Sequence, residues 1–291
     1  MRAPTKSVVK TNMKADVKSN AKRHLNGLME KEMHGQWRRQ RDELASIDVA
    51  NSDNWMKYAN LTPETESLLC AAQEQTLATN YVRNKIWKTE CSPVCRLCRE
   101  QPETVAHIVS GCKCLAGTKY TARHDKVGTY IHWCVLKDLG IEVCNEWYKH
   151  VPEKTVEKDD ITIMWDSSII TEKKVPANRP DVTIHNRKER SAMLIDFSVP
   201  NDTNIVTKTA EKLIKYRDLE VEVKKCWNLK TVQTVPVVIG ALGAVSTDHK
   251  QYLKLISKNI EAKIVQKTAL LGTANILRCV LGMENQKETS N

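Results

Sequence analysis

The segment spanning residues 179–216 constrains the fold more than any other part of the chain. Apolar residues alternate over residues 181–184 and again over 191–199, and a polar stretch at 186–190 separates the two runs. Alternation of this kind is typical of half-buried strands, so the segment predicts a strand, a turn and a second strand. A sheet with at least one antiparallel hairpin must therefore form.

Such a hairpin would bring two acids, Asp181 and Asp196, close together. Residues 203–227 then contain neither Gly nor Pro and predict one helix, with Asp202 placed to cap it. Three lysines of this helix fall at i, i+4 and i+7 and share one face: Lys208, Lys212 and Lys215. Two hard oxygen ligands facing lysines can hold a divalent metal against a scissile phosphate, which predicts a nuclease core that uses Mg²⁺ or Mn²⁺.

Each of these residues also has a purely structural interpretation. Asp181 could cap the start of a strand, Asp196 could be a buried acid paired with Lys212, and the lysines could form a solvated helix face. The nuclease interpretation is favoured because the residues occur together and follow a metal-binding pattern.

That pattern is Cys95-x2-Cys98-x8-His107-x4-Cys112. The spacing puts two thiolates on one tight turn and the His and last Cys on one helical turn, so four soft ligands can close tetrahedrally on a structural zinc ion. Cys91 and Cys114 lie nearby and remain alternatives to Cys95 or Cys112.

Composition narrows the class of partner. The chain has 291 residues, 41% of them hydrophobic, which is enough for a packed core, and a net charge of +10. The first 41 residues hold eleven Lys or Arg against three Asp or Glu, which favours a polyanionic partner. The sequence shows no membrane span and no apolar signal core, so we expect no membrane association and a reducing compartment. It carries no signal for an oligomeric state.

We expect four regions in an α/β chain. Residues 1–45 predict a basic, partly flexible arm, 46–90 a helical connector, 91–150 the CCHC knuckle with its following helix, and 151–285 the nuclease domain.

Several elements are predicted within these regions. Residues 55–58 and 63–87 predict helices, the second capped by Thr62 and started by a proline. A helix over residues 120–139 would present Arg123 and His124 to nucleic acid or to the knuckle. Residues 161–165 and 168–171 predict a hairpin around Asp166 that lies on the sheet beside the strand that follows Asp181.

The last third of the chain completes the expected fold. Residues 231–241 predict a central strand, parallel and reached by a helical crossover. Residues 248–257 and 260–281 predict two covering helices.

Five motifs follow one another in the chain: the CCHC knuckle, Arg-His-Asp, Arg-Pro-Asp, Ile-Asp-Phe and Glu-Lys-x-x-Lys-Tyr. This order resembles the C-terminal half of site-specific non-long-terminal-repeat retrotransposon proteins. The resemblance covers residues 60–240 and does not include a reverse transcriptase domain. It implies a restriction-like endonuclease of the PD-(D/E)-xK type, with a mixed sheet flanked by helices. In that group the lysine usually lies two residues after the second acid, where this chain has Ser198.

The resemblance implies roles for individual residues. Asp181 and Asp196 would be the acids and Lys212 the displaced lysine, with Glu211 and Lys215 as further candidates. Arg123, His124 and Lys208 would contact nucleic acid. The implied partners are a DNA target and, as a second partner, the RNA of the transposable element. The implied location is the nucleus. The implied product is a nick whose 3′ hydroxyl primes reverse transcription. The alternative is a catalytically inactive or domesticated zinc-knuckle protein that binds nucleic acid.

Overall fold

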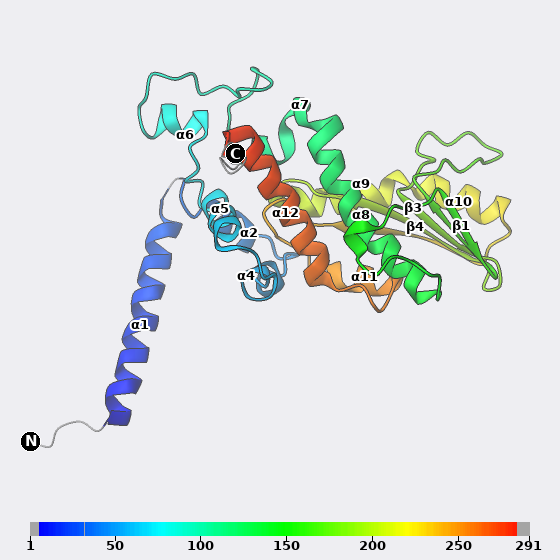
Figure 1. Ribbon diagram of the computed structural model, residues 1–291, viewed down its shortest axis with the longest axis horizontal. Coiled ribbons are helices and arrows are strands. Elements are labelled where there is room, and N and C mark those ends of the chain that lie inside the picture. The colour runs from blue at the N-terminus through cyan, green and yellow to red at the C-terminus, as the bar shows by residue number, and fades with distance from the viewer. Residues whose placement is uncertain (1–5, 32, 284–291) are drawn as a thin grey trace, which may run out of the picture.

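The computed structural model describes residues 6–31 and 33–283, and it contains a five-stranded sheet, which lies in the right half of Figure 1. The strands follow one another across the sheet in chain order. Neighbours from β1 to β4 are antiparallel, whereas β4 and β5 are parallel. The strands are β1 Thr155–Lys158, β2 Ile161–Trp165, β3 Val182–Asn186, β4 Ser191–Ser198 and β5 Thr231–Val238. The chain thus has the mixed α/β architecture that its sequence predicts.

Helices cover both faces of this sheet. Those before it are α1 Lys6–Met29, α2 Gln36–Asp42, α3 Val49–Ser52, α4 Trp55–Tyr58, α5 Pro63–Gln73, α6 Asn80–Lys85, α7 Lys113–Leu115 and α8 Thr121–Asp138. Those after it are α9 Ile205–Lys215, α10 Arg217–Cys226, α11 His249–Ile256 and α12 Ala262–Leu281. Single π or 3₁₀ turns are η1 His107–Gly111, η2 Ala116–Tyr120, η3 Trp147–Lys149 and η4 Asp202–Asn204.

Strand alternation sorts the core residues between two layers. Ile195 and Phe197 of β4 pack with α8, α11 and α12 on one face of the sheet. Ala192 and Leu194 pack with Tyr216 and residues of α10 on the other face. Side chains at even positions of β4 therefore face the α9–α10 layer, and Asp196 belongs to this set.

The predicted hairpin is confirmed. β3 and β4 are antiparallel, with Val182 opposite Ile195 and Asn186 opposite Ser191. The Asn186 side chain accepts a 3.0 Å hydrogen bond from the backbone N–H of Glu189, which closes the polar turn.

The predicted hairpin around Asp166 is wrong. β2 pairs with β1, and the turn between them contains Asp159, whose φ of 52° reverses the chain. β1 is an edge strand with exposed Thr155 and Glu157 and only one apolar residue, Val156, so it lacks the apolar alternation that marks a strand in sequence. Residues 168–171 form no strand. β2 does pair with β3, as predicted.

β5 is parallel to β4, as predicted, but it is an edge strand and not a central one. Its residues are apolar because helices cover both of its faces, not because strands flank it. Two features protect its open edge. Pro236 has no N–H to offer, and the Glu220 carboxylate accepts from the backbone N–H of Thr234 at 2.6 Å.

The predicted helix over residues 203–227 is two helices that meet at Tyr216. The Tyr216 ring is fully buried, and its φ of −100° and ψ of 4° end α9 and change the direction of the chain. The prediction that Asp202 caps this helix is also wrong. Its carboxylate accepts instead from the backbone N–H groups of Leu242 and Ala244, both at 2.8 Å.

The helices before the sheet match the predictions in part. α4 is confirmed, and α5 begins with Pro63 and is capped by Thr62, which accepts from the N–H of Thr65. The predicted helix over 63–87 is interrupted, because Gln75 has a φ of 55° and Thr79 caps a separate helix, α6. α1 projects away from the other elements (Figure 1). Residues 1–5 and 32 of the predicted basic arm lie outside the described residues.

The segment before the sheet shares a core with the end of the chain. Buried residues of α2, α4 and α5 pack with those of α12. The Gln73 side chain donates to the Leu242 carbonyl at 2.8 Å, and the Gln266 side chain donates to the Gly243 carbonyl at 2.6 Å. None of the helices in the described parts of the chain is long and apolar enough to cross a membrane.

We expect acid to destabilise this fold through His249. Burial of its ring, with repulsion from Lys250 second, lowers the His249 pKa to about 4. Because this folded value lies below the unfolded one, the neutral ring contributes full stability above about pH 6.5, and that contribution is lost as the pH falls to about 4. The difference corresponds to about 3 kcal/mol. Urea denaturation across this pH range should show a shallower loss of unfolding free energy in His249→Leu than in wild type.

The matched control is His24→Leu, because His24 is exposed on α1. It should leave the pH dependence unchanged. Some dependence should remain in His249→Leu, since burial also lowers the pKa of His132 to about 4. An identical pH profile for wild type and His249→Leu would contradict the assignment.

Candidate functional site

The two predicted acids, Asp181 and Asp196, lie at the same end of the β3–β4 hairpin. Asp181 directly precedes β3, and the register that pairs Val182 with Ile195 sets Asp181 opposite Asp196. Directly opposite residues have Cβ atoms about 4.5–5.5 Å apart. One oxygen of Asp181 also accepts a 2.6 Å hydrogen bond from the backbone N–H of Phe197, which fixes its position.

Asp196 lies in the layer between the sheet and α9, and only 1% of the residue is exposed. Lys212 forms an ion pair with its Oδ2, which accepts no hydrogen bond from the other described residues. The Lys215 Nζ lies 3.1 Å from Oδ1. Burial favours the neutral acid, but Lys212 first and then Tyr216 and Lys215 outweigh it and hold the Asp196 pKa below its ordinary value. The carboxylate is therefore ionised at neutral pH.

Tyr216 is a member of this site that the motif analysis leaves out. Its hydroxyl donates to Asp196 and accepts from the Lys215 Nζ at 2.7 Å. Burial first, and then the charge of Asp196, raise the Tyr216 pKa, so the hydroxyl stays protonated and remains a donor. A tyrosine that ends the lysine motif was the only sequence signal for this role.

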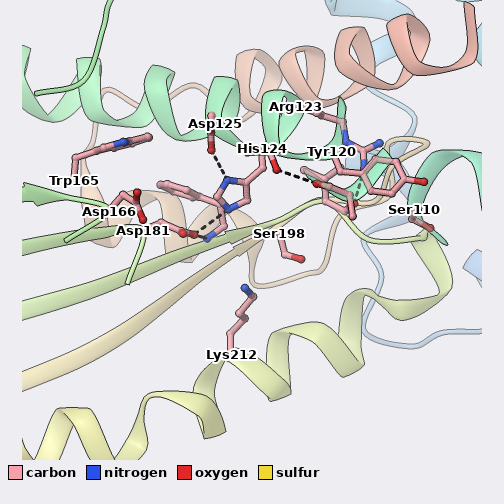
Figure 2. Close-up of a pocket in the computed structure, with 14 residues that line it drawn as sticks. Ser110, Tyr120, Arg123, His124, Asp125, Trp165, Asp166, Asp181, Ser198 and Lys212 are labelled. Atoms are coloured by element: carbon pink, nitrogen blue, oxygen red, sulfur yellow. Dashed lines mark hydrogen bonds and ion pairs between the residues drawn. The ribbon is translucent and has the colours of Figure 1, made fainter. Parts of the chain in front are cut away.

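His124, near the start of α8, bridges two carboxylates. Its Nε2 lies 3.1 Å from Asp181 Oδ2, and its Nδ1 lies 2.9 Å from Asp125 Oδ1 (Figure 2). Burial opposes the charged ring, but hydrogen bonding and charge from Asp181 and then Asp125 outweigh it and raise the His124 pKa to about 9. At neutral pH the imidazolium donates from both nitrogens and offsets the charge of Asp181.

Asp181, His124 and Lys212 border a cleft of about 500 Å³ at the end of the sheet, whereas Asp196 and Tyr216 do not line it. Figure 2 shows His124 and Asp181 on one side of it and Lys212 reaching toward it from α9. Its lining residues come from the end of the sheet, from α8 and α9 and from the turns before α8: Ser110, Ala116, Tyr120, Thr121, Arg123, His124, Asp125, Trp165, Asp166, Asp181, Phe197, Ser198, Val199 and Lys212.

Three other predicted site residues are placed differently. Arg123 is 3% exposed, and its guanidinium donates to Thr273 Oγ1 at 2.8 Å and to the Val199 carbonyl at 2.9 Å. The guanidinium is thus engaged in packing α8 against α12, and burial lowers its pKa to about 10. Lys208 and Glu211 form an ion pair with each other on α9, and neither forms an ion pair or hydrogen bond with Asp181 or Asp196.

The predicted zinc ligands do come together. One donor atom from each of Cys95, Cys98, His107 and Cys112 lies within 4.8 Å of the others. Cys95 Sγ is 3.9 Å from Cys112 Sγ, and Cys98 Sγ is 3.3 Å from His107 Nε2. This Cys/His cluster could hold a metal ion, and three sulfurs with one nitrogen are a donor set typical of structural zinc.

The alternative ligands lie outside the cluster. Cys91 Sγ is near Thr89 Oγ1 at 3.2 Å and the Asn80 carbonyl at 3.8 Å, and Cys114 is exposed. The four residues named from spacing are therefore the ones that geometry favours.

Buried polar contacts hold the backbone around the Cys/His cluster. Glu103, fully buried, accepts from the Arg96 guanidinium and from the backbone N–H groups of Arg96 and Asn80. The Tyr120 hydroxyl accepts from the Cys112 N–H at 3.0 Å and donates to the Ile108 carbonyl at 2.8 Å. Contacts of this kind orient metal ligands and connect the cluster to α6 on one side and to α8 on the other.

The two acids meet the needs of a different metal. Among the described residues, the Cys/His cluster is the one group in which three or more Cys, His, Asp or Glu donors lie within 4.8 Å of one another. Asp181 and Asp196 supply only two carboxylates. Mg²⁺ commonly takes one or two carboxylates and fills its other positions with water and substrate phosphate, so this donor set fits a catalytic magnesium. The Asp181 side chain, 22% exposed, opens onto the cleft from which a phosphate would arrive.

No protein-family model matches this chain, and no curated protein matches its sequence. Any function must therefore be argued from the residues and their geometry.

We expect one zinc ion per chain, bound by the Cys/His cluster. His107→Ala should lose most of the metal, measured by elemental analysis of the purified protein, and should unfold at a lower temperature because the metal cross-links the segment before α8. Cys91→Ser is the matched control, since Cys91 lies outside the cluster, and it should keep both properties. Stoichiometric zinc and unchanged thermal stability in His107→Ala would show that the assignment is wrong.

Proposed function

We propose that this protein is a metal-dependent DNA endonuclease that makes single-strand nicks. The observation that carries the proposal is the pair Asp181 and Asp196, opposite each other on one hairpin, with the Lys212 ammonium on Asp196 at the rim of the cleft. A carboxylate and a cation that line a cleft, with a second carboxylate paired to the same cation, are parts suited to metal-dependent phosphodiester hydrolysis.

Asp181 and Asp196 would hold Mg²⁺ or Mn²⁺. The bound ion would supply Lewis-acid stabilisation of phosphate charge and an activated water. The depressed pKa of Asp196 keeps it ionised and ready to serve as a ligand at neutral pH. His124 fixes Asp181 Oδ2 beside the cleft, so this carboxylate has a defined orientation before any substrate binds.

Lys212 is the lysine that we assign to the reacting water and phosphate. It lines the cleft, whereas Lys215 is not among the lining residues and is held by the Tyr216 hydroxyl. The ion pair with Asp196 Oδ2 keeps the Lys212 ammonium at the boundary between the buried acid and the cleft. From there it can orient a water or offset developing charge on a phosphate oxygen. Glu211 and Lys215 remain candidates of second rank.

The arrangement supports the restriction-like type that the resemblance implies. Ser198, two residues after Asp196 on β4, occupies the place where the usual nuclease lysine would stand, and it lines the cleft. Lys212 reaches the same acid from α9. A lysine displaced from the strand to the next helix is the feature expected of the retrotransposon family. The proposal extends to the family's role, namely a nick whose 3′ hydroxyl primes reverse transcription, with a DNA target, element RNA and a nuclear location.

Zinc bound by the Cys/His cluster would have a structural role. Ser110, between the ligands His107 and Cys112, lines the cleft. Holding these ligands together therefore also holds one wall of the cleft in place. The net charge of +10 favours the approach of a polyanion to this wall.

A second candidate function is a nucleic-acid-binding protein that has kept the nuclease fold without activity. One observation favours it. The Asp196 side chain is only 2% exposed and contacts two ammonium groups and a hydroxyl, so a metal would have to compete with all three.

We expect plasmid nicking that requires magnesium or manganese and the two acids. Asp181→Ala and Asp196→Asn should reduce the nicking rate below detection, because each removes a metal ligand. Lys212→Ala should lower it roughly hundredfold or more through loss of charge stabilisation. Conversion of supercoiled plasmid to open circles on agarose gels measures each rate.

Lys224→Ala serves as the matched control, because Lys224 is an exposed lysine on α10 that is not part of the cleft. It should nick like wild type. If wild type fails to nick supercoiled, relaxed and single-stranded DNA with either metal, the nuclease proposal is wrong. Nucleic-acid binding without cleavage is then the function that stands. Normal nicking by Lys212→Ala with none by Lys215→Ala would keep the nuclease and reassign the lysine.

A further inference from the structure

Helix α6 and the residues after it expose an unusual set of side chains. Trp87 is 53% exposed and Ile86 is 45% exposed. All seven tryptophans lie within the described residues, and Trp87 is the one among them whose side chain is exposed; the others are buried or half-buried. A large aromatic side chain normally gains free energy by burial, so its exposure here calls for a partner.

The backbone that carries Trp87 is held in place. Its N–H donates to the Val82 carbonyl at 3.0 Å, and both the N–H and the hydroxyl of Thr89 donate to the Arg83 carbonyl. The Asn84 side chain donates to the Cys91 carbonyl at 2.7 Å. The exposed indole is therefore attached to an ordered turn, and the backbone of this turn loses little conformational entropy when a ligand binds.

Three cations lie within four residues of Trp87 in the chain. Arg83, Lys85 and Lys88 are exposed, and their side chains form no hydrogen bond or ion pair within the described residues. Glu90 is the only acid in residues 75–99. A ligand at this surface would meet a strongly positive potential that no nearby carboxylate offsets.

The helix dipole accounts for only some of these exposed side chains. Arg83 and Lys85 lie in the last turn of α6, where basic residues interact favourably with the helix dipole. The dipole does not explain Lys88, which lies beyond the helix at a φ of 57°, or the exposed indole beside it. An apolar protein partner would explain Trp87 and Ile86 but not the cations.

We infer that this surface, Arg83, Lys85, Ile86, Trp87 and Lys88, binds single-stranded nucleic acid. Bases of a single strand offer open π-faces on which an indole can stack, and the phosphates on either side can contact the cations. Duplex bases are already stacked on one another and present no such face. We call this surface the α6 platform.

The α6 platform lies at the end of the molecule away from the strands (Figure 1). It is joined to the Cys/His cluster, because the Asn80 side chain donates to the Val94 carbonyl and the Asn80 N–H donates to Glu103. Ser110 of the same region lines the cleft. A single strand on the platform would thus be held by the unit that also forms a wall of the cleft. The inference stands on the exposed side chains alone and does not require the proposed nicking activity.

Fluorescence anisotropy with a fluorescein-labelled oligothymidylate tests the α6 platform on the full chain, in buffer without magnesium so that cleavage does not enter. Trp87→Ala should weaken binding roughly tenfold or more, the loss expected for one stacked base. Trp87→Phe should restore most of the affinity. Affinity for a blunt duplex of the same length should change by less than about twofold, because phosphate contacts dominate there.

The double variant Lys85→Gln with Lys88→Gln provides independent evidence. Its slope of log affinity against log salt should be shallower by roughly 0.7 for each lost contact with a single strand. Tyr148→Ala is the matched control, since Tyr148 is a 66% exposed aromatic residue next to a lysine on η3, and it should bind like wild type.

Three outcomes would overturn the inference. The first is wild-type affinity of Trp87→Ala for the oligothymidylate. The second is an equal loss of affinity for single strand and duplex. The third is Trp87-dependent binding to phosphatidylserine vesicles with no binding to the oligothymidylate, which would identify a membrane surface instead. Unchanged zinc content and thermal stability of Trp87→Ala would confirm that any loss of binding is local.

Discussion

The neutralisation of Asp196 is the interaction on which most of this structure depends. A carboxylate that is 1% exposed is costly unless charged or hydrogen-bonding partners compensate it. Here Lys212, Lys215 and Tyr216 all come from one short segment, so α9 has to pack over β5 on the face where Asp196 lies, with Lys212 and Lys215 reaching Asp196. The chain must also turn at Tyr216 for the hydroxyl to reach the acid, which is why α10 starts with a new direction. This crossover then delivers β5 parallel to β4. One buried charge thereby relates the sheet, the helix break and the site.

The other wall of the cleft depends on closure between distant parts of the chain. The turn after β5 receives hydrogen bonds from Gln73 and Gln266 and donates two to Asp202. Arg123 joins α8 to α12 and to the carbonyl that follows β4. These contacts set the start of α8, and with it His124, against the end of the hairpin. The cleft therefore exists only when the segment before the sheet and the last helix are packed together.

The sequence predicted those features that local pattern controls. Alternation gave the hairpin with its two acids, capping chemistry at Thr62 gave the start of α5, and thiol spacing gave the Cys/His cluster. It failed where tertiary contacts override local pattern. β1 looks like a loop because an edge strand needs no apolar alternation, and β5 looks central because helices cover both its faces. Pro236 could have predicted the edge position of β5, since a proline within a strand indicates an edge strand. The roles of Asp202, Tyr216 and Arg123 depend on partners 20 to 150 residues away, which no local pattern reveals.

Two adjacent carboxylates would be expected to repel each other without a metal, yet here each is already compensated. Lys212 and Lys215 balance Asp196, and His124 lies between Asp181 and Asp125. In the proposed reaction a metal must therefore replace cations and not merely fill a gap between two anions. The replacement becomes favourable when a phosphate enters the cleft, because Lys212 then exchanges a carboxylate oxygen for a phosphate oxygen and keeps an anionic partner. Metal and nucleic acid would each favour the binding of the other, since both bind better when Lys212 has moved from the Asp196 carboxylate to a phosphate. Under the proposed function, such a site would hold a metal weakly by itself and tightly only when a phosphodiester is bound beside it.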